Sequence, residues 1–208
     1  RDSTGALAYA FVFGLVFASI KIPWQRIEMI GTEHIMLAIF SAISLAFLTM
    51  LGFNETEPPA WTLPLAGICA ISAMLVPGIS GSLILLILGH YAIVTSALHD
   101  AEIGTLGLFA TGVIVGAVLA IPIINKLLNT HHDRMMAVLT GLIAGSLPTL
   151  WPWKNQYDIE QGRMTNIAPE GQFIYVIFWM LTGIAIILIT KQLEHRAGNR
   201  PNDPFEEA

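Results

Sequence analysis

The fold of this chain is decided by an apolar stretch, Trp61–Leu98, that is interrupted near its middle. Its centre reads Ala73-Met74-Leu75-Val76-Pro77-Gly78-Ile79-Ser80-Gly81-Ser82-Leu83-Ile84-Leu85. Proline lacks the amide proton that a helix requires, and glycine adopts backbone angles that other residues resist. The stretch therefore predicts two half-helices, Trp61–Val76 and Leu83–Leu98, that are separated by an unwound loop at Pro77–Ser82.

The rest of the chain is also built from long apolar stretches. Hydrophobic residues make up 54% of the 208 residues and charged residues only 12%, whereas about a quarter of a soluble domain is charged. A bilayer core about 30 Å thick needs roughly 20 apolar residues for one helical crossing. Each half-helix would be only about 24 Å long, which favours a re-entrant hairpin over two full crossings but leaves both open. The other expected spans are 5–22, 34–53, 106–124, 135–153 and 173–190.

These stretches predict an all-α fold, a polytopic integral membrane helical bundle with a broken or re-entrant hairpin at 61–98. We expect the transmembrane domain to cover residues 1–196. The segment 197–208 contains Gly, Asn, two prolines and three acidic residues, a composition that favours a disordered cytoplasmic tail.

The charges in the loops predict how the chain is oriented in the membrane. Lys and Arg lie in the loops 21–33 and 125–134 and in the tail from Lys191, while the loops 54–60 and 99–105 carry only acidic charges. Basic residues near span ends stay preferentially in the cytoplasm. We therefore expect Glu57 and Asp100 on the same, external face.

Composition also argues against several classes of function. The net charge is -5 and no basic stripe exists, which disfavours a nucleic-acid partner, and the single cysteine, Cys69, allows no intrachain disulfide. The apolar stretches hold no acidic residue. We therefore expect no catalytic residue, metal or cofactor, and we expect His34, His90 and His99 to cap helices or face water.

The loop at the break is the first candidate site. Unwound backbone at membrane depth persists only where protein or a polar cavity satisfies its amide and carbonyl groups. Ser80 or Ser82 could cap a half-helix that begins near Leu83, and the free amides and hydroxyls there would attract an anion. Broken helices in transporters form binding sites in this way, while a proline kink at a tight helix contact is the alternative. The expected substrate-binding residues are Pro77, Gly78, Ser80, Gly81 and Ser82.

The end of the 135–153 stretch is the second candidate. Gly141 and Gly145 give one helix face the small residues needed for close packing, and Trp151-Pro152-Trp153-Lys154 ends the span. Trp and Lys commonly anchor a span at the membrane surface. The functional alternative is that Lys154 and the two indole rings contact a lipid headgroup, with Lys154 as the weaker, outer substrate contact.

Two of these motifs resemble signatures of a known family. The residues 73–91, and Thr140-Gly141-Leu142-Ile143-Ala144-Gly145-Ser146-Leu147 followed by 151–154, are similar to the polyprenyl-phosphate transporter family, the undecaprenyl-phosphate translocases. The resemblance covers nearly the whole chain. It implies a multi-pass flippase in the bacterial cytoplasmic membrane that returns undecaprenyl phosphate or a related carrier for cell-envelope synthesis. Polyprenyl phosphate and membrane lipids would be its partners, and a homo-oligomer and coupling to an ion gradient both stay open.

The resemblance also bears on architecture. Family members carry an earlier Pro-Gly-x-Ser-Gly element in a first repeat, so the resemblance implies two inverted halves, of which this chain would supply the second. Two other functions remain open. A membrane phosphatase acting on polyprenyl diphosphate would need acid or base groups beside the loop, and in a non-transporting assembly subunit the loop would be only a packing hinge.

Overall fold

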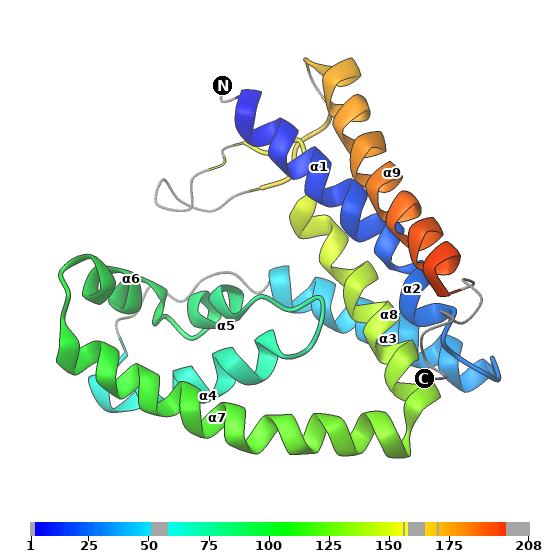
Figure 1. Ribbon diagram of the computed structural model, residues 1–208. Coiled ribbons are helices and arrows are strands. Elements are labelled where there is room, and N and C mark those ends of the chain that lie inside the picture. The colour runs from blue at the N-terminus through cyan, green and yellow to red at the C-terminus, as the bar shows by residue number, and fades with distance from the viewer. Residues whose placement is uncertain (1–2, 51–57, 156, 158–164, 170, 199–208) are drawn as a thin grey trace, which may run out of the picture. The chain divides into compact units, whose positions relative to one another are not determined.

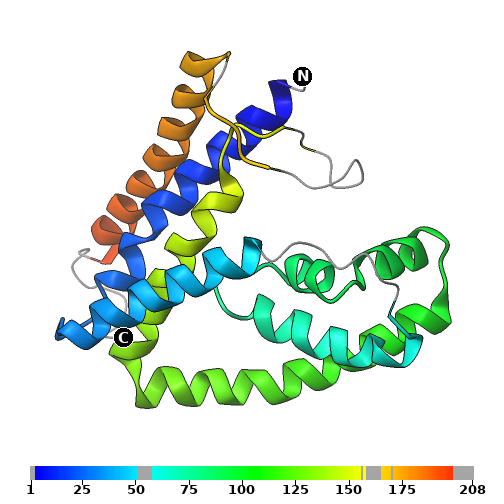
Figure 2. The ribbon, with the colours of Figure 1, turned by 180° about the vertical axis from the view of Figure 1, so that it is seen from behind.

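The computed structural model describes residues 3–50, 58–155, 157, 165–169 and 171–198. In this part of the chain the regular structure is helical, apart from one antiparallel bridge between Lys154 and Asn166. The contacts divide the chain into two compact units, Arg1–Ser19 with Leu150–Ala208, and Ile20–Thr149. Each unit is described on its own (Figures 1 and 2).

Four of the described helical stretches are long and apolar enough to cross a membrane, and a bent helix pair makes a fifth if it is one broken span. This confirms the all-α, polytopic fold class. The α9 helix includes Ala197 and Gly198, which we had assigned to the tail, and residues 199–208 lie outside the described part. The four stretches are Thr4–Trp24, formed by α1 (Ser3–Ser19) and α2 (Lys21–Trp24), α3 (Thr32–Met50), α7 (Ile103–Thr130) and α9 (Phe173–Gly198).

In the first unit, α1 packs along α9 through glycine. A Cβ atom at Gly14 would overlap the carbonyl of Met180, and one at Gly183 would overlap the carbonyl of Phe11. Lipid gives helices no hydrophobic drive to associate, so close backbone approach at small residues is what holds such pairs.

The second unit contains two such helix pairs. The α3 helix packs along α8 (His132–Ser146), and α4 (Leu63–Met74), which follows the short η1 helix (Ala60–Thr62), packs along α7 (Figures 1 and 2). Gly141 and Gly145 lie against the backbone of α3. The expected small-residue face of this stretch is therefore a helix contact.

The first turn of α8 binds the loop that precedes α3. The amides of Glu28 and Met29 donate to the two carboxylate oxygens of Asp133 at 3.2 and 3.3 Å, and these hydrogen bonds hold the pKa of Asp133 below its usual value. Arg134 forms an ion pair with Glu33 at 3.3 Å. The two basic loops 21–33 and 125–134 thus meet at one end of the unit.

The α8 helix is shorter than the span expected at 135–153. It ends at Ser146 after 15 residues, which is about 22 Å, and the 3-10 helix η2 (Leu147–Leu150) follows. Pro148 explains the early end, because proline has no amide proton to donate to the carbonyl four residues earlier in the helix.

The second half-helix, expected to run unbroken over 83–98, is in fact divided, so that prediction was wrong. It forms α5 (Gly81–Ile87) and α6 (Tyr91–His99), bent by 114°. Gly89 has φ +75°, its amide donates to Leu86 O at 3.1 Å, and the His90 amide donates to Leu85 O at 2.8 Å. These are the two bonds of a Schellman motif, a common helix stop.

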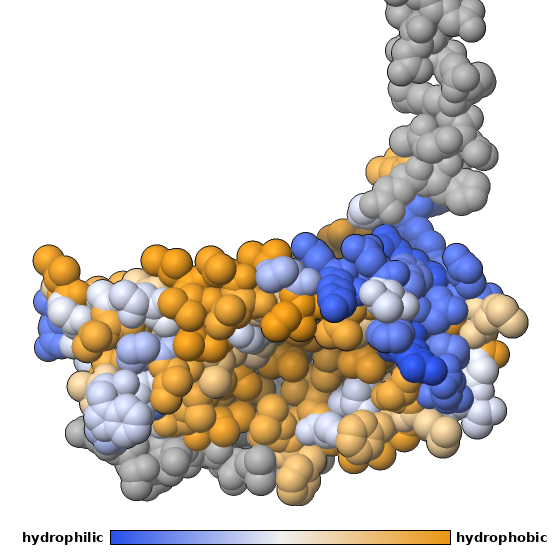
Figure 3. All heavy atoms as spheres, turned by 90° about the horizontal axis from the view of Figure 1, so that it is seen from below, coloured by the Kyte–Doolittle hydropathy of each residue, from blue (hydrophilic) through white to orange (hydrophobic). Residues whose placement is uncertain are grey.

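The surface of α7 suits a lipid environment. Ile114, Val115, Val118 and Ile121 are exposed on it, and the face drawn in Figure 3 has an extended apolar area beside a hydrophilic one. Exposed apolar area of this extent fits contact with acyl chains, since a water-soluble monomer seldom exposes so large a patch.

Candidate functional site

The interruption begins with a tight turn over Val76–Ile79. The Ile79 amide donates to Val76 O at 3.3 Å, Pro77 takes the second position and Gly78 the third with φ +98°. These are the features of a type II turn, which needs a positive φ at its third residue. A Cβ atom at Gly78 would also lie 2.8 Å from the carbonyl carbon of Leu142. Glycine is thus required here both by the turn and by its contact with α8.

The two serines lie together just after this turn. Ser80 is the N-cap residue of α5, with φ -90° and ψ 131°, but its hydroxyl makes no capping hydrogen bond. Instead Ser80 Oγ lies 2.7 Å from Ser82 Oγ. The helix begins at Gly81 rather than near Leu83, so Ser82 is already inside its first turn. Both serines are exposed, and they present a pair of hydroxyls at the break.

Gly81 brings α5 close to α4. A Cβ atom on this half-buried glycine would lie 3.1 Å from Ala70 O and 3.7 Å from Met74 Cβ. The five residues expected at the first candidate site therefore form a turn and the start of α5, with Gly78 lying against α8 and Gly81 against α4. Lys154 belongs to the other unit.

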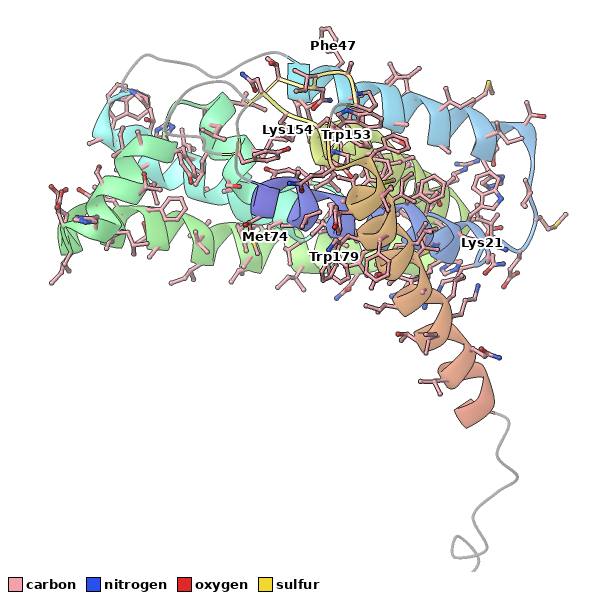
Figure 4. The ribbon with its side chains drawn as sticks, turned by 90° about the horizontal axis from the view of Figure 1, so that it is seen from above. Lys21, Phe47, Met74, Trp153, Lys154 and Trp179 are labelled. Carbon is pink, nitrogen blue, oxygen red and sulfur yellow. The ribbon has the colours of Figure 1, made fainter. Side chains whose placement is uncertain are left out.

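Lys154 is buried, not exposed as expected for an outer anchor. Only 6% of the residue is accessible. Its Nζ donates to Asn166 Oδ1 at 3.0 Å and lies 5.2 Å from the centre of the Tyr9 ring. Figure 4 shows Lys154 beside Trp153. Burial lowers the pKa of the Lys154 amine. The amine therefore already has a hydrogen-bond acceptor and an aromatic face within the first unit.

The segment around Lys154 is held in place by hydrogen bonds of side chains as well as of the backbone. The Trp151 indole donates to Ile167 O at 3.0 Å, the Tyr157 hydroxyl donates to Pro152 O at 2.6 Å, and the rings of Trp151 and Trp153 lie 5.4 Å apart. Backbone hydrogen bonds on either side of the Lys154–Asn166 bridge hold residues 165–167 against residues 153–155. Sequence reasoning missed Tyr9 and Asn166, which lie far from Lys154 along the chain.

The histidines differ from one another. His34 Nδ1 accepts a hydrogen bond from the Gly31 amide at 3.1 Å, as expected for a capping residue, and the His99 side chain is 88% exposed. His90 is only 4% exposed and is bonded through both ring nitrogens, one of them to Thr62. Thr62 was missed by sequence reasoning. Among the residues that the structure describes, no group of three or more His, Cys, Asp or Glu could hold a metal ion.

Comparison with known proteins places the chain in a family. A family model described as undecaprenyl phosphate translocase-like matches residues 2–168. A Vibrio cholerae protein named polyprenyl-phosphate transporter is 36% identical over 197 residues, covering 86% of this chain and 64% of the relative. A Staphylococcus aureus protein of the same name is 35% identical over 158 residues, covering 68% of this chain and 55% of the relative.

The chain thus spans less than two thirds of the length of either relative. No solved structure matches it significantly. The family match nevertheless extends over most of the chain and includes both the loop Pro77–Ser82 and Lys154. The chain therefore belongs to the undecaprenyl phosphate translocase-like family.

Proposed function

We propose that this chain is part of a transporter that moves undecaprenyl phosphate, or a related polyprenyl phosphate, across the bacterial cytoplasmic membrane during recycling of the cell-envelope carrier lipid. The names of both relatives support a transporter rather than an enzyme. The observation that carries the proposal for this chain is the exposed hydroxyl pair of Ser80 and Ser82, which lies where the unwound segment after α4 meets the start of α5.

The physical reason is the cost of moving a phosphate through hydrocarbon. An ion that loses its water is strongly destabilised unless polar groups replace the lost hydrogen bonds. The hydroxyls of Ser80 and Ser82 now bond to each other and can exchange that bond for bonds to phosphate oxygens. Backbone amides of the first turn of α5 have no partner within the helix and add further donors. Because the loop holds no fixed cation, the phosphate can leave again.

We further propose that the basic loops 21–33 and 125–134 lie in the cytoplasm. The ion pair between Arg134 and Glu33 joins these two loops, which supports the same-side assignment that their charges predict. Glu57, which we expect on the external face, lies outside the described residues. For Lys154 we propose an indirect role, in which its bond to Asn166 fixes the Trp151 and Trp153 rings at the membrane surface.

The test is reconstitution of the full-length protein in liposomes and measurement of the transbilayer movement of a labelled short-chain polyprenyl phosphate. A hydrogen bond to a charged group contributes about 1.5 to 3 kcal/mol, so Ser80→Ala and Ser82→Ala should each weaken substrate binding by about 10- to 150-fold. Their thermal stability should stay within about 0.5 kcal/mol of wild type, because both serines are exposed.

Ser96→Ala is the matched control. Its hydroxyl is also exposed but bonds to Ile93 O within α6, so transport should be unchanged. If the double variant Ser80→Ala with Ser82→Ala transports the lipid at the wild-type rate, the loop is not the phosphate site.

A further inference from the structure

The loop between α2 and α3 lies at a surface of the membrane. The apolar stretch Thr4–Trp24 ends where this loop begins, and α3 starts at Thr32, where the loop ends. Both stretches are long and apolar enough to cross a bilayer. The residues 25–31 that join them must therefore lie near the lipid headgroups.

One side of this loop is packed against α8. Pro23 at the end of α2 is buried, and Ile27 forms a buried cluster with Met136 and Ala137 of α8. The indole of Trp24 packs against the same cluster. These contacts determine which side of the loop the protein covers.

The backbone beyond Ile27 is held by hydrogen bonds to side chains. The carboxylate of Asp133 accepts the amides of Glu28 and Met29 at 3.2 and 3.3 Å. Nδ1 of His34 accepts the Gly31 amide at 3.1 Å. Because these polar groups already have partners, the loop can keep one conformation without burying its own side chains.

Two large apolar side chains are exposed on this fixed loop, close to two basic residues. Met29 is 79% exposed and Ile30 is 56% exposed. Lys21 and Arg26 are exposed as well, and within the described part of the chain neither of them forms an ion pair. Glu28 is the only acidic residue in the segment 21–31. The segment therefore has a net charge of about +1 beside exposed apolar surface.

We propose that the segment 21–31 is a binding site for anionic lipid. Met29 and Ile30 enter the outer part of the acyl-chain region, because apolar side chains gain free energy by leaving water. Lys21 and Arg26 bind headgroup phosphates, since long basic side chains can lie along apolar surface while their charges reach the headgroups. Bound in this way, the segment holds the paired ends of α3 and α8 at a fixed depth in the bilayer.

Fluorescence quenching measures the depth of the two apolar residues. Bimane is attached to one cysteine at a time in full-length protein in nanodiscs, with Cys69 and any other cysteine replaced by serine. The labels on Met29→Cys and Ile30→Cys should be quenched by lipid that is brominated near the headgroup end of its acyl chains, and should be protected from aqueous iodide.

Two further positions calibrate the measurement. Phe40 is 71% exposed on the apolar surface of α3, so Phe40→Cys should report lipid. His131 is exposed between α7 and α8, so His131→Cys should report water. If iodide quenches the label at Met29 as strongly as the label at His131, or if neither quencher reaches it, the proposal is overturned.

Lipid selectivity tests the two basic residues. The bromine is carried either by phosphatidylglycerol or by phosphatidylcholine, and the quenching of the label on Met29→Cys gives the relative affinity of the site for the two lipids. A net charge of about +1 predicts a preference of about fivefold for phosphatidylglycerol. The preference should disappear in Lys21→Gln with Arg26→Gln and should increase in Glu28→Gln.

Lys126→Gln is the matched control, because it removes one exposed positive charge from α7, outside the segment. It should leave the lipid preference unchanged. All of these side chains are exposed, so the variants should unfold within about 2 °C of wild type. An equal affinity for the two lipids in the wild type, or a preference that persists in Lys21→Gln with Arg26→Gln, contradicts the proposal.

Discussion

The loop Pro77–Ser82 and the segment that carries Lys154 both follow the end of a helix, and both were expected to meet a lipid headgroup, but they are built in opposite ways. In the loop, a type II turn and a contact of Gly78 with α8 fix the backbone, and the serine hydroxyls stay exposed. In the Lys154 segment, side chains bond to each other and to backbone, and the amine is buried. Hydrogen-bonding partners, and not formal charge, determine which polar group can receive a ligand.

The largest effect is expected at Gly78. Gly78→Ala adds the cost of a positive φ, about 1 to 2 kcal/mol, to that of an overpacked contact with Leu142, about 1 to 3 kcal/mol. We therefore expect a loss of about 2 to 5 kcal/mol, measured by thermal unfolding in detergent. Gly171→Ala is the matched control, because Gly171 has φ +66° but a Cβ atom there would meet no other atom within 4 Å. Equal losses in the two variants would mean that the contact with α8 does not fix the loop.

A smaller but still large effect is expected at Lys154. Lys154→Glu places an unpaired anion beside Asn166 Oδ1 and the face of the Tyr9 ring, and should destabilise the protein by about 3 kcal/mol. Lys154→Met keeps the packing of the stem and loses chiefly one hydrogen bond, so about 1 kcal/mol is expected. Thermal unfolding of the two variants measures the difference. If both are as stable as wild type, Lys154 is an exposed anchor, and the contrast with the loop disappears.

The smallest expected effect is the change of stability with pH. Burial lowers the pKa of Lys154 from its ordinary value of 10.5, so between the lowered and the ordinary pKa the folded protein binds fewer protons than the unfolded chain. Stability must then rise with pH across that window, and the cost of burying the charge is fully present only below the lowered pKa. We expect the stability of wild type relative to Lys154→Met to increase as the pH rises toward the ordinary pKa of 10.5. A constant or falling difference in chemical-denaturation measurements would contradict the buried amine.

The sequence predicted those features that depend on local backbone chemistry. Apolar stretches predicted the helices, Pro77 and Gly78 predicted the break, and Gly141 and Gly145 predicted a close helix contact. The division of the second half-helix was missed although Gly89 is a helix-stop residue, because the apolar run continues across it. The burial of Lys154 could not be predicted, since it depends on Tyr9 and Asn166, which are brought to it only by the tertiary fold.

The glycine contact between α4 and α7 restricts how the second unit can move. A Cβ atom at Gly67 would lie 2.5 Å from Phe109 O, and one at Gly116 would lie 2.5 Å from Ile71 Cγ2. Rotating either helix by one residue, or sliding it along its partner, would place a side chain where only a hydrogen atom fits. The two helices therefore behave as a single rod, to which the close contact of Gly81 with Ala70 attaches the start of α5.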